Sequence, residues 1–462
     1  MSLIAPFAGL RPRAELAAEV AAPPYDVMST AEARAMVQGR PSSFLHISRA
    51  EVDLPEGTDP YSEAVYAKAR ENLERLRTEG TLQQDPTPRY YAYRLSLGEH
   101  QQTGLVAAAS VAAYLKGQIR RHELTRPAKE QDRVRQISAL NAQTGPVFLA
   151  YRATSAIDDR LQAICQGPSA IDIRAADGVR HQLWSIDADD EIGAFNQAFA
   201  AVNRLYIADG HHRAAAAARV AEARQHGTTA KATPNANATA ATHTTATTQA
   251  TATTDATTTG KTTATATADG ETKSQSQSQP QPQPSDHFLA VLFPHDQLRI
   301  LPYNRVVRDL NGLEPAQFLD RIAKSYRLEP SAQPVAPTER GEVGLYLAGR
   351  WYRLSLSPER IPATDPIGRL DVSLLHDQLI EPVLGITDPR RDERIDFVGG
   401  IRGLEGLSAR VDSGEMAVAF SLPATRMEDL LAVADANALM PPKSTWFEPK
   451  LSDGLVSHLL SG

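Results

Sequence analysis

Cysteine and long apolar runs are almost absent from this sequence of 462 residues. Its one cysteine, Cys165, excludes an internal disulfide and a cysteine-rich metal site, and it is compatible with a reducing cytosol. Because no run of about 18 apolar residues occurs, no membrane-spanning helix is expected. The N-terminal segment is interrupted by Pro6, Pro12 and charged side chains, unlike a secretory signal. We therefore expect a soluble, cytoplasmic protein with no membrane partner.

A surplus of positive charge is absent as well. The chain has 48 basic and 55 acidic residues, which gives a formal net charge of -7. This balance supplies no broad cationic surface, so a nucleic-acid partner is not expected, although a local basic cleft is compatible with it. The length suffices for two or three domains and leaves a homo-oligomer open.

Large apolar side chains are nearly missing from residues 228–285, which consist mostly of Thr, Ala, Ser, Gln and Pro. Such a segment cannot bury enough surface to offset the entropy of ordering it, so we predict a disordered insertion. A tolerated surface loop is favoured over a partner-binding tail. The insertion separates an N-terminal part, 1–227, from a C-terminal part, 286–462, and we expect the two to pack together.

The flanking sequence alternates between helical and strand patterns, which predicts a mixed α/β (α+β) protein. Helices are expected at 31–40, 59–80, 129–140 and 371–385. Strands are expected at 90–97, 105–115 and 146–152, as two strands around a turn within 287–307, and as a hairpin at 341–356.

One short motif carries most of the chemistry. Apolar residues 205–208 have strand character and residues 213–224 have high helix propensity, so "DGHHR" (209–213) lies at a strand-to-helix turn. The first N–H groups of a helix are unpaired and favour an anion. Gly210 permits close approach of the backbone, Arg213 offers a planar fork to phosphate oxygens, and His211 and His212 can donate hydrogen bonds.

Other interpretations of this motif remain open. Asp209 can orient a histidine, cap the helix or help to hold Mg²⁺, and the whole motif can be an ordinary Asp-Gly turn with a few surface charges. A zinc site is disfavoured because adjacent histidines point apart on a strand and diverge on a helix. Neither "HHR" (211–213) nor "RHELT" (121–125) forms a His-Glu-x-x-His pattern.

Three motifs occur in a characteristic order: His122-Glu123, Gly145-Pro146-Val147, and Asp209 to Arg213. Together, over roughly 115–227, they resemble the nucleotide-binding core of the ParB/sulfiredoxin-like superfamily, in particular its free-serine kinases. A wider resemblance covers nearly all of the chain outside the insertion, and it links the sequence to the family called domain of unknown function 1015. It rests on "IAPFAGLRPR", "AAPPYDV", "RHELTRP", "NAQTGPVFLAYR", "YIADGHHRAAAAARV", "LPYNRVV", "DFVGGIRG" and "MPPKSTWFEPK".

The resemblance implies a ParB/sulfiredoxin-like core with additional N- and C-terminal elements. It also implies phosphorylation of free L-serine to O-phospho-L-serine, with ATP or ADP as donor and Mg²⁺ as cofactor. By this resemblance Glu123 is the candidate base, and His122 orients it or contacts phosphate. The residues assigned to donor phosphates are Gly210, His211, His212 and Arg213, with Asp209 near the metal or the substrate. Without the resemblance, Glu123 is better explained as a residue that caps the following helix.

Two further segments are candidates for completing the pocket. Lys443, Ser444 and Thr445 suit a phosphate or carboxylate, but the glycines of a Walker A loop are absent and a plain C-terminal turn is an equal alternative. Tyr25 and Asp26 follow two prolines, and a rigid turn that packs on the core is favoured over substrate contact.

The alternative function is a ParB-like nucleotide-binding regulator without kinase activity. The acidic balance disfavours it, as do histidines where the ParB phosphate loop more typically has Glu-Arg-Arg. Sulfiredoxin chemistry needs a cysteine in the equivalent turn, and none is there. A non-enzymatic protein on an old kinase scaffold is the remaining class, and the presence of Glu123 with the whole 209–213 motif argues against it.

Overall fold

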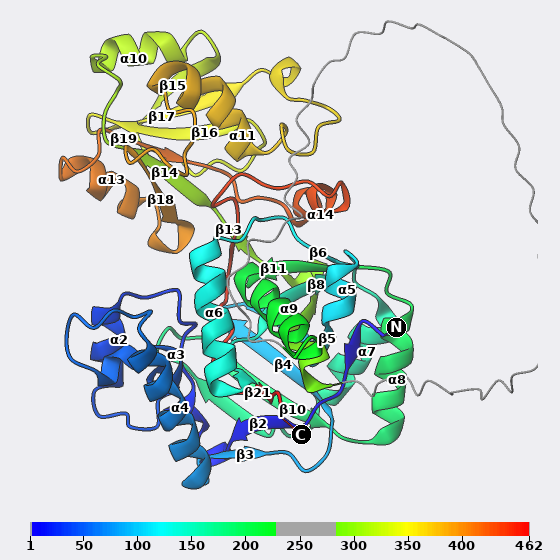
Figure 1. Ribbon diagram of the computed structural model, residues 1–462. Coiled ribbons are helices and arrows are strands. Elements are labelled where there is room, and N and C mark those ends of the chain that lie inside the picture. The colour runs from blue at the N-terminus through cyan, green and yellow to red at the C-terminus, as the bar shows by residue number, and fades with distance from the viewer. Residues whose placement is uncertain (1, 228–282, 462) are drawn as a thin grey trace, which may run out of the picture. The chain divides into compact units, whose positions relative to one another are not determined.

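A computed structural model describes residues 2–227 and 283–461, so the predicted insertion lies almost wholly outside the described residues. A nine-stranded mixed sheet is the largest element, with the strand order β6-β11-β8-β12-β5-β4-β10-β9 and β1 paired to β5 (Figure 1). Its strands are β1 (Ile4–Ala5), β4 (Tyr90–Leu97), β5 (His100–Ser110), β6 (Ile119–Arg120), β8 (Val147–Tyr151), β9 (Ile171–Arg174), β10 (Arg180–Ile186), β11 (Leu205–Asp209) and β12 (His287–Pro294). The predicted mixed α/β class is confirmed.

The strand that follows the insertion lies in the middle of this sheet. β12 pairs with β8 in parallel and with β5 in antiparallel orientation. The chain segments on both sides of the insertion therefore contribute to one hydrogen-bonded sheet.

Helices cover one face of the nine-stranded sheet, and the alternation of side chains along β4 explains why both faces are apolar. Tyr90 and Ala92 belong to the buried cluster under the helices, whereas Tyr91 and Tyr93 belong to the cluster on the other face. The covering helices are α5 (Val111–Leu115), α6 (Pro127–Leu140), α7 (Ser155–Ile164), α8 (Asp189–Ala200) and α9 (His211–Gln225). Figure 1 shows α6 beside α9 on this face.

A six-stranded antiparallel sheet, in the order β15-β17-β16-β19-β14-β18, is built from the C-terminal part. Its strands are β14 (Tyr303–Val307), β15 (Tyr326–Ser331), β16 (Glu342–Leu347), β17 (Arg350–Leu356), β18 (Ile395–Gly399) and β19 (Val418–Ser421). The helices that accompany it are α10 (Pro315–Ile322), α11 (Asp371–Leu375), α12 (Glu381–Leu384), α13 (Glu405–Asp412) and α14 (Met427–Asp435).

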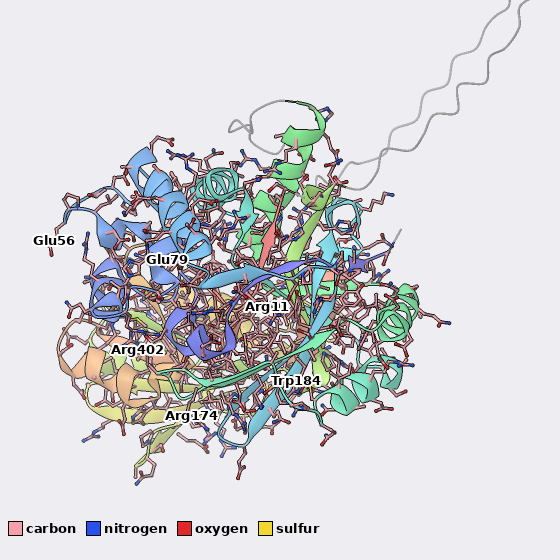
Figure 2. All side chains as sticks on the ribbon, turned by 90° about the horizontal axis from the view of Figure 1, so that it is seen from below. Arg11, Glu56, Glu79, Arg174, Trp184 and Arg402 are labelled. Carbon is pink, nitrogen blue, oxygen red and sulfur yellow. The ribbon has the colours of Figure 1, made fainter. Side chains whose placement is uncertain are left out.

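Two small sheets tie distant segments together. The four-stranded one has the order β3-β2-β21-β7, and the two-stranded one pairs β13 with β20. Their strands are β2 (Gly9–Pro12), β3 (Leu82–Gln84), β7 (Ala142–Gln143), β21 (Ser457–Leu459), β13 (Ile300–Leu301) and β20 (Trp446–Phe447). Figure 2 shows the molecule from below, with Arg11 on β2 and Trp184 on β10 labelled. The remaining helices are α1 (Ala17–Val20), α2 (Thr30–Val37), α3 (Leu45–Ser48) and α4 (Glu63–Thr78).

Most predicted elements are confirmed, and three need correction. The segment 105–115 is a strand only to Ser110, whose side chain accepts a hydrogen bond from Ala113 and caps the short helix α5. The two main strands of 287–307 do not form a hairpin, because β12 joins the nine-stranded sheet and β14 the six-stranded one. The helix expected at 371–385 has a π-helical segment, His376–Ile380, before Pro382, which lacks the N–H that an α-helix needs.

No helix among residues 2–227 and 283–461 is both long and apolar enough to span a membrane.

Candidate functional site

The strand-to-helix turn predicted from "DGHHR" is confirmed. β11 ends at Asp209, Gly210 is the N-cap residue with φ of 96°, and α9 starts at His211. A Cβ atom on Gly210 would lie 2.9 Å from Nε of Arg213. Both the left-handed backbone and the adjacent guanidinium therefore require glycine at this position.

Gly210→Ala is expected to lower the free energy of unfolding by about 1–3 kcal/mol, because it adds backbone strain and a contact with Arg213. Chemical denaturation measures this change. Gly193→Ala is the matched control, since Gly193 is inside α8 and an added Cβ meets nothing within 4 Å. The control should gain up to about 1 kcal/mol from helix propensity, and equal stability of the two variants would contradict the argument.

The side chain of Arg213 is directed into the protein. Only 8% of the residue is exposed, and Nη1 donates a hydrogen bond to the carbonyl of Pro146. Its Nη2 lies 3.7 Å from Oδ1 of Asp209. Arg213 therefore joins the turn to the start of β8 and holds the carboxylate of Asp209.

Asp209 is paired with a lysine from the C-terminal segment. Nζ of Lys450 donates a hydrogen bond of 3.1 Å to Oδ2 of Asp209. Burial opposes ionisation of the carboxyl group, but the positive charges of Lys450 and Arg213 outweigh it and hold the pKa of Asp209 well below its ordinary value. Asp209 is therefore a permanent carboxylate at neutral pH, and about a third of its side chain is exposed.

His122 and His211 form a buried pair behind this carboxylate. Their rings meet edge to face with centroids 4.5 Å apart, and the backbone N–H of His122 donates to Nε2 of His211 at 3.4 Å. Burial lowers the pKa of His122 to about 4 and that of His211 well below its ordinary value, so both rings are neutral. Within the described part of the chain, neither ring nitrogen of His122 has a hydrogen bond of good geometry. The carbonyl of Ile207 lies near the ring and raises the pKa of His122 slightly against the effect of burial.

Glu123 lies at the edge of the histidine pair, with Oε2 3.9 Å from Nδ1 of His211. Burial raises the pKa of Glu123, and the negative charge of Asp209 adds to this, while Lys443 acts in the opposite direction. Its side chain is 46% exposed. A carboxylate with a raised pKa and access to solvent is suited to accept a proton.

The N-terminus of α6 meets the same turn. The backbone N–H of Arg126, the N-cap residue of α6, donates a hydrogen bond of 2.9 Å to Nε2 of His212. Burial lowers the pKa of His212 to about 4, so the ring is a neutral acceptor. His212 therefore fixes the start of α6 against the start of α9, and it places two helix N-termini next to each other.

The C-terminal segment closes the other side. Lys443 has a left-handed backbone, with φ of 57°, and its Nζ lies 5.5 Å from the ring centre of Tyr303. The hydroxyl of the buried Ser444 donates to the carbonyl of Pro441. An added Cβ on Gly399 would lie 2.9 Å from the ring of Trp446. Gly399 in "DFVGGIRG" thus allows Trp446 to pack against β18. Arg402 of the same motif, labelled in Figure 2, is exposed.

These segments enclose an open cleft of about 1000 Å³, which we call the first cleft. The predicted site residues that line it are His122, Glu123, Asp209, His212, Lys443, Ser444 and Thr445. The other three, Gly210, His211 and Arg213, lie behind its wall and support it. Tyr25 and Asp26, for which packing on the core was favoured over substrate contact, also line the first cleft.

Sequence reasoning missed three cations of the first cleft: Arg126, Lys129 and Lys450. Arg126 and Lys129 lie on either side of Pro127, the first residue of α6. A proline four residues after Glu123 was therefore an available signal for a helix N-terminus close to His-Glu. Lys450 carried no such signal, because its partner Asp209 is 241 residues away in sequence.

Solved structures similar to this chain have low identity to it. One is a free serine kinase in complex with AMP, with 11% identity, a TM-score of 0.32, and coverage of 74% of this chain and 86% of that chain. A conserved hypothetical protein from Pyrococcus furiosus has 11% identity, a TM-score of 0.32 and coverage of 75% and 93%. C-terminally truncated SbnI from Staphylococcus aureus has 8% identity, a TM-score of 0.32 and coverage of 75% and 85%.

No curated protein sequence matches the chain. A family model does match it, over residues 4–251 and 262–373, and that family is described as "Protein of unknown function (DUF1015)". The match spans most of the chain and includes the motifs around His122, Gly145 and Asp209. The chain therefore belongs to the DUF1015 family.

Proposed function

We propose that this protein is a phosphotransferase that moves a phosphoryl group from ATP or ADP to the hydroxyl group of free L-serine. One observation carries the proposal: a carboxylate with a raised pKa, Glu123, lies in one cleft with cations and two helix N-termini. The order of the motifs at His122, Gly145 and Asp209, which resembles that of free-serine kinases, supports the choice of acceptor.

Donor phosphates fit the part of the first cleft near the helix N-termini. The side chains of Arg126, Lys129 and Lys443 line the first cleft and make no ion pair within residues 2–227 and 283–461, and Nζ of Lys443 lies over the ring of Tyr303. These cations are therefore free to neutralise phosphate oxygens, and the unpaired N–H groups at the starts of α6 and α9 add further donors. In this assignment His211 and Arg213 do not contact the phosphates. They lie outside the lining of the first cleft and hold Glu123 and Asp209 in position.

Asp209 suits a magnesium ion bound together with phosphates. Mg²⁺ is usually held by one or two carboxylates plus substrate phosphates, and Asp209 offers an ionised, partly exposed carboxylate in the first cleft. Lys450 at 3.1 Å occupies one of its oxygens and fixes its orientation. When bound, the ion would neutralise charge on the transferred phosphoryl group.

Glu123 is the proposed base. As the serine oxygen forms its bond to phosphorus, the hydroxyl proton passes to Oε of Glu123 and the bond to the leaving phosphate oxygen breaks. The neutral His211 next to Glu123 adds no positive charge that would lower its basicity. His122 packs on His211 and so positions it.

The pH dependence tests the base directly. Because burial raises the pKa of Glu123, kcat/KM should fall on the acid side with an apparent pKa above 4.5, the ordinary value. Lys443→Met removes a charge that lowers the pKa of Glu123, so the acid limb should move to higher pH. Lys443 is not among the main influences on the pKa of His122 or His212, so an unmoved limb would assign the titration to another group.

A phosphoryl-transfer assay tests the activity. Purified protein, Mg²⁺ and ATP or ADP in parallel are incubated with free L-serine, other hydroxy amino acids and small hydroxy acids, and products are identified by mass spectrometry. O-phospho-L-serine formed by the wild type and lost in Glu123→Gln supports the proposal. Nucleotide binding with no product from any acceptor would contradict it and favour a nucleotide-binding regulator.

A further inference from the structure

A second polar cleft, of about 720 Å³, lies beside the first. It follows one face of α6 and is closed by α3, α4 and the turn after Pro24. Three residues line both clefts: Tyr25, Asp26 and Lys129. Its other walls include Ser48, Arg49, Glu51, Tyr61, Tyr66, Asp132, Arg133 and Gln136. The two clefts thus share a wall, and Lys129 at the start of α6 stands where they meet.

We propose that the second cleft holds the nucleoside of the donor nucleotide, with its phosphates extending past Lys129 into the first cleft. This inference rests on the proposed function, because it assigns the two parts of the same donor to two clefts. One side of the second cleft is formed by residues 25–66, which lie outside the 115–227 segment that resembles the kinase core, and the other side by α6, which lies within it.

Both arginines of the second cleft are already paired with carboxylates, which distinguishes this cleft from a phosphate site. Nε of Arg49 lies 2.7 Å from Oε1 of Glu51, and Nη2 of Arg133 lies 2.6 Å from Oδ2 of Asp132. The guanidinium of Arg133 also covers the ring of Tyr25 at 3.8 Å. Such a lining suits a polar ligand without charge, such as a base and a ribose, better than a polyanion.

Two groups in the second cleft, the hydroxyl of Ser48 and the carboxylate of Asp26, lack the partner that a ligand would supply. The hydroxyl of Ser48 is buried, with the residue 7% exposed, and it has no hydrogen-bond partner in the described part of the chain. The carboxylate of Asp26 is exposed and makes no ion pair or hydrogen bond with any described residue. Ser48 can bond to a base or ribose, and Asp26 can accept hydrogen bonds from ribose hydroxyls.

Tyr61 provides a surface for the base. It is 49% exposed, which is unusual for a large aromatic side chain, and it lines the second cleft. Its backbone is held independently of the ring, because its N–H donates to Asp59 and its carbonyl accepts from Arg135. An exposed aromatic ring on a fixed backbone at the edge of a polar cleft can stack on a base.

The size of the two substrates decides which of them occupies this cleft. The reacting hydroxyl must reach Glu123 in the first cleft, and free serine is too short to do so from beyond the wall formed by Tyr25 and Asp26. A nucleotide has its base at one end and its reacting phosphate at the other. It can therefore occupy both clefts, which leaves the space around Glu123 for the acceptor.

Calorimetric binding of two probes, ADP and inorganic pyrophosphate, both with Mg²⁺ and without acceptor, separates the clefts. The affinity for pyrophosphate depends only on the first cleft, whereas the affinity for ADP depends on both clefts. Tyr61→Ala should bind ADP at least about fivefold more weakly, with pyrophosphate affinity unchanged, because a lost base stack costs about that much or more. Ser48→Ala should show the same pattern with a smaller change. Leu115→Ala is the control, since Leu115 is 55% exposed at the end of α5 and lines neither cleft.

The outcomes distinguish the two proposals. Unchanged ADP affinity in both Tyr61→Ala and Ser48→Ala, with a wild type that binds ADP and pyrophosphate, would overturn the nucleoside assignment and leave the phosphotransferase intact. A wild type that binds neither probe would overturn the proposed function itself. A parallel loss of ADP and pyrophosphate binding in Tyr61→Ala would also overturn the assignment, because it would mean that the substitution disturbs the first cleft.

Discussion

Glu123→Gln is expected to lower turnover about 100-fold or more while leaving nucleotide affinity nearly unchanged. Glutamine keeps the shape and the polar contacts of the side chain but cannot take up the proton of the acceptor hydroxyl. Because 46% of the Glu123 side chain is exposed and it makes no ion pair with a lysine or arginine in the described part of the chain, folding should tolerate the change. Single-turnover rates with saturating donor and acceptor measure the effect, and calorimetry measures donor binding.

A matched substitution separates loss of the base from loss of a negative charge. Glu222→Gln changes an exposed glutamate in the last turns of α9, outside the first cleft, and should leave turnover unchanged. Equal turnover in Glu123→Gln and Glu222→Gln would remove Glu123 from the proposed role. A Glu123→Gln protein that no longer binds nucleotide would instead place Glu123 among the groups that hold the donor.

Arg213→Met is expected to have the largest effect on stability, about 2–3 kcal/mol of unfolding free energy. The substitution keeps the length of a flexible chain but removes the donor to the Pro146 carbonyl, and it leaves Asp209 paired with Lys450 alone. Breaking a buried pair is costly because the remaining partner is left without its compensating charge. Denaturation in urea, followed by circular dichroism, measures the loss.

Arg126→Met is the comparison for this prediction. Arg126 is exposed at the start of α6, and its bond to His212 uses the backbone N–H, which methionine retains. Stability should therefore change by less than about 0.5 kcal/mol, whereas ADP affinity should fall. If Arg213→Met were as stable as Arg126→Met, Arg213 would not be the structural residue that its contacts indicate.

The local sequence pattern was enough to predict elements that depend mainly on their own residues, such as a strand or a tight turn. The strand-like composition of 90–97 predicted β4 with the bounds observed, and Ala348-Gly349 predicted the turn between β16 and β17. It failed at 105–115, where Ser110 caps a helix instead of continuing the strand, because apolar alanines suit a buried strand and a buried helix equally well.

The sequence alone determined the turn at Asp209–Arg213 and its position between a strand and a helix, since these depend on neighbours in the chain. Its link to His122-Glu123, almost 90 residues away, came from the family resemblance and not from local pattern. Only the tertiary structure decided which of these side chains face the first cleft. Arg213 was expected at donor phosphates, but the third residue of α9 is directed towards Pro146 and lies buried. Lys450 reaches Asp209 only because the C-terminal segment folds back, and no local spacing encodes a pair separated by 241 residues. Side-chain direction and long-range charge pairing result from packing among distant segments, so the composition of the cleft emerged only in the folded chain.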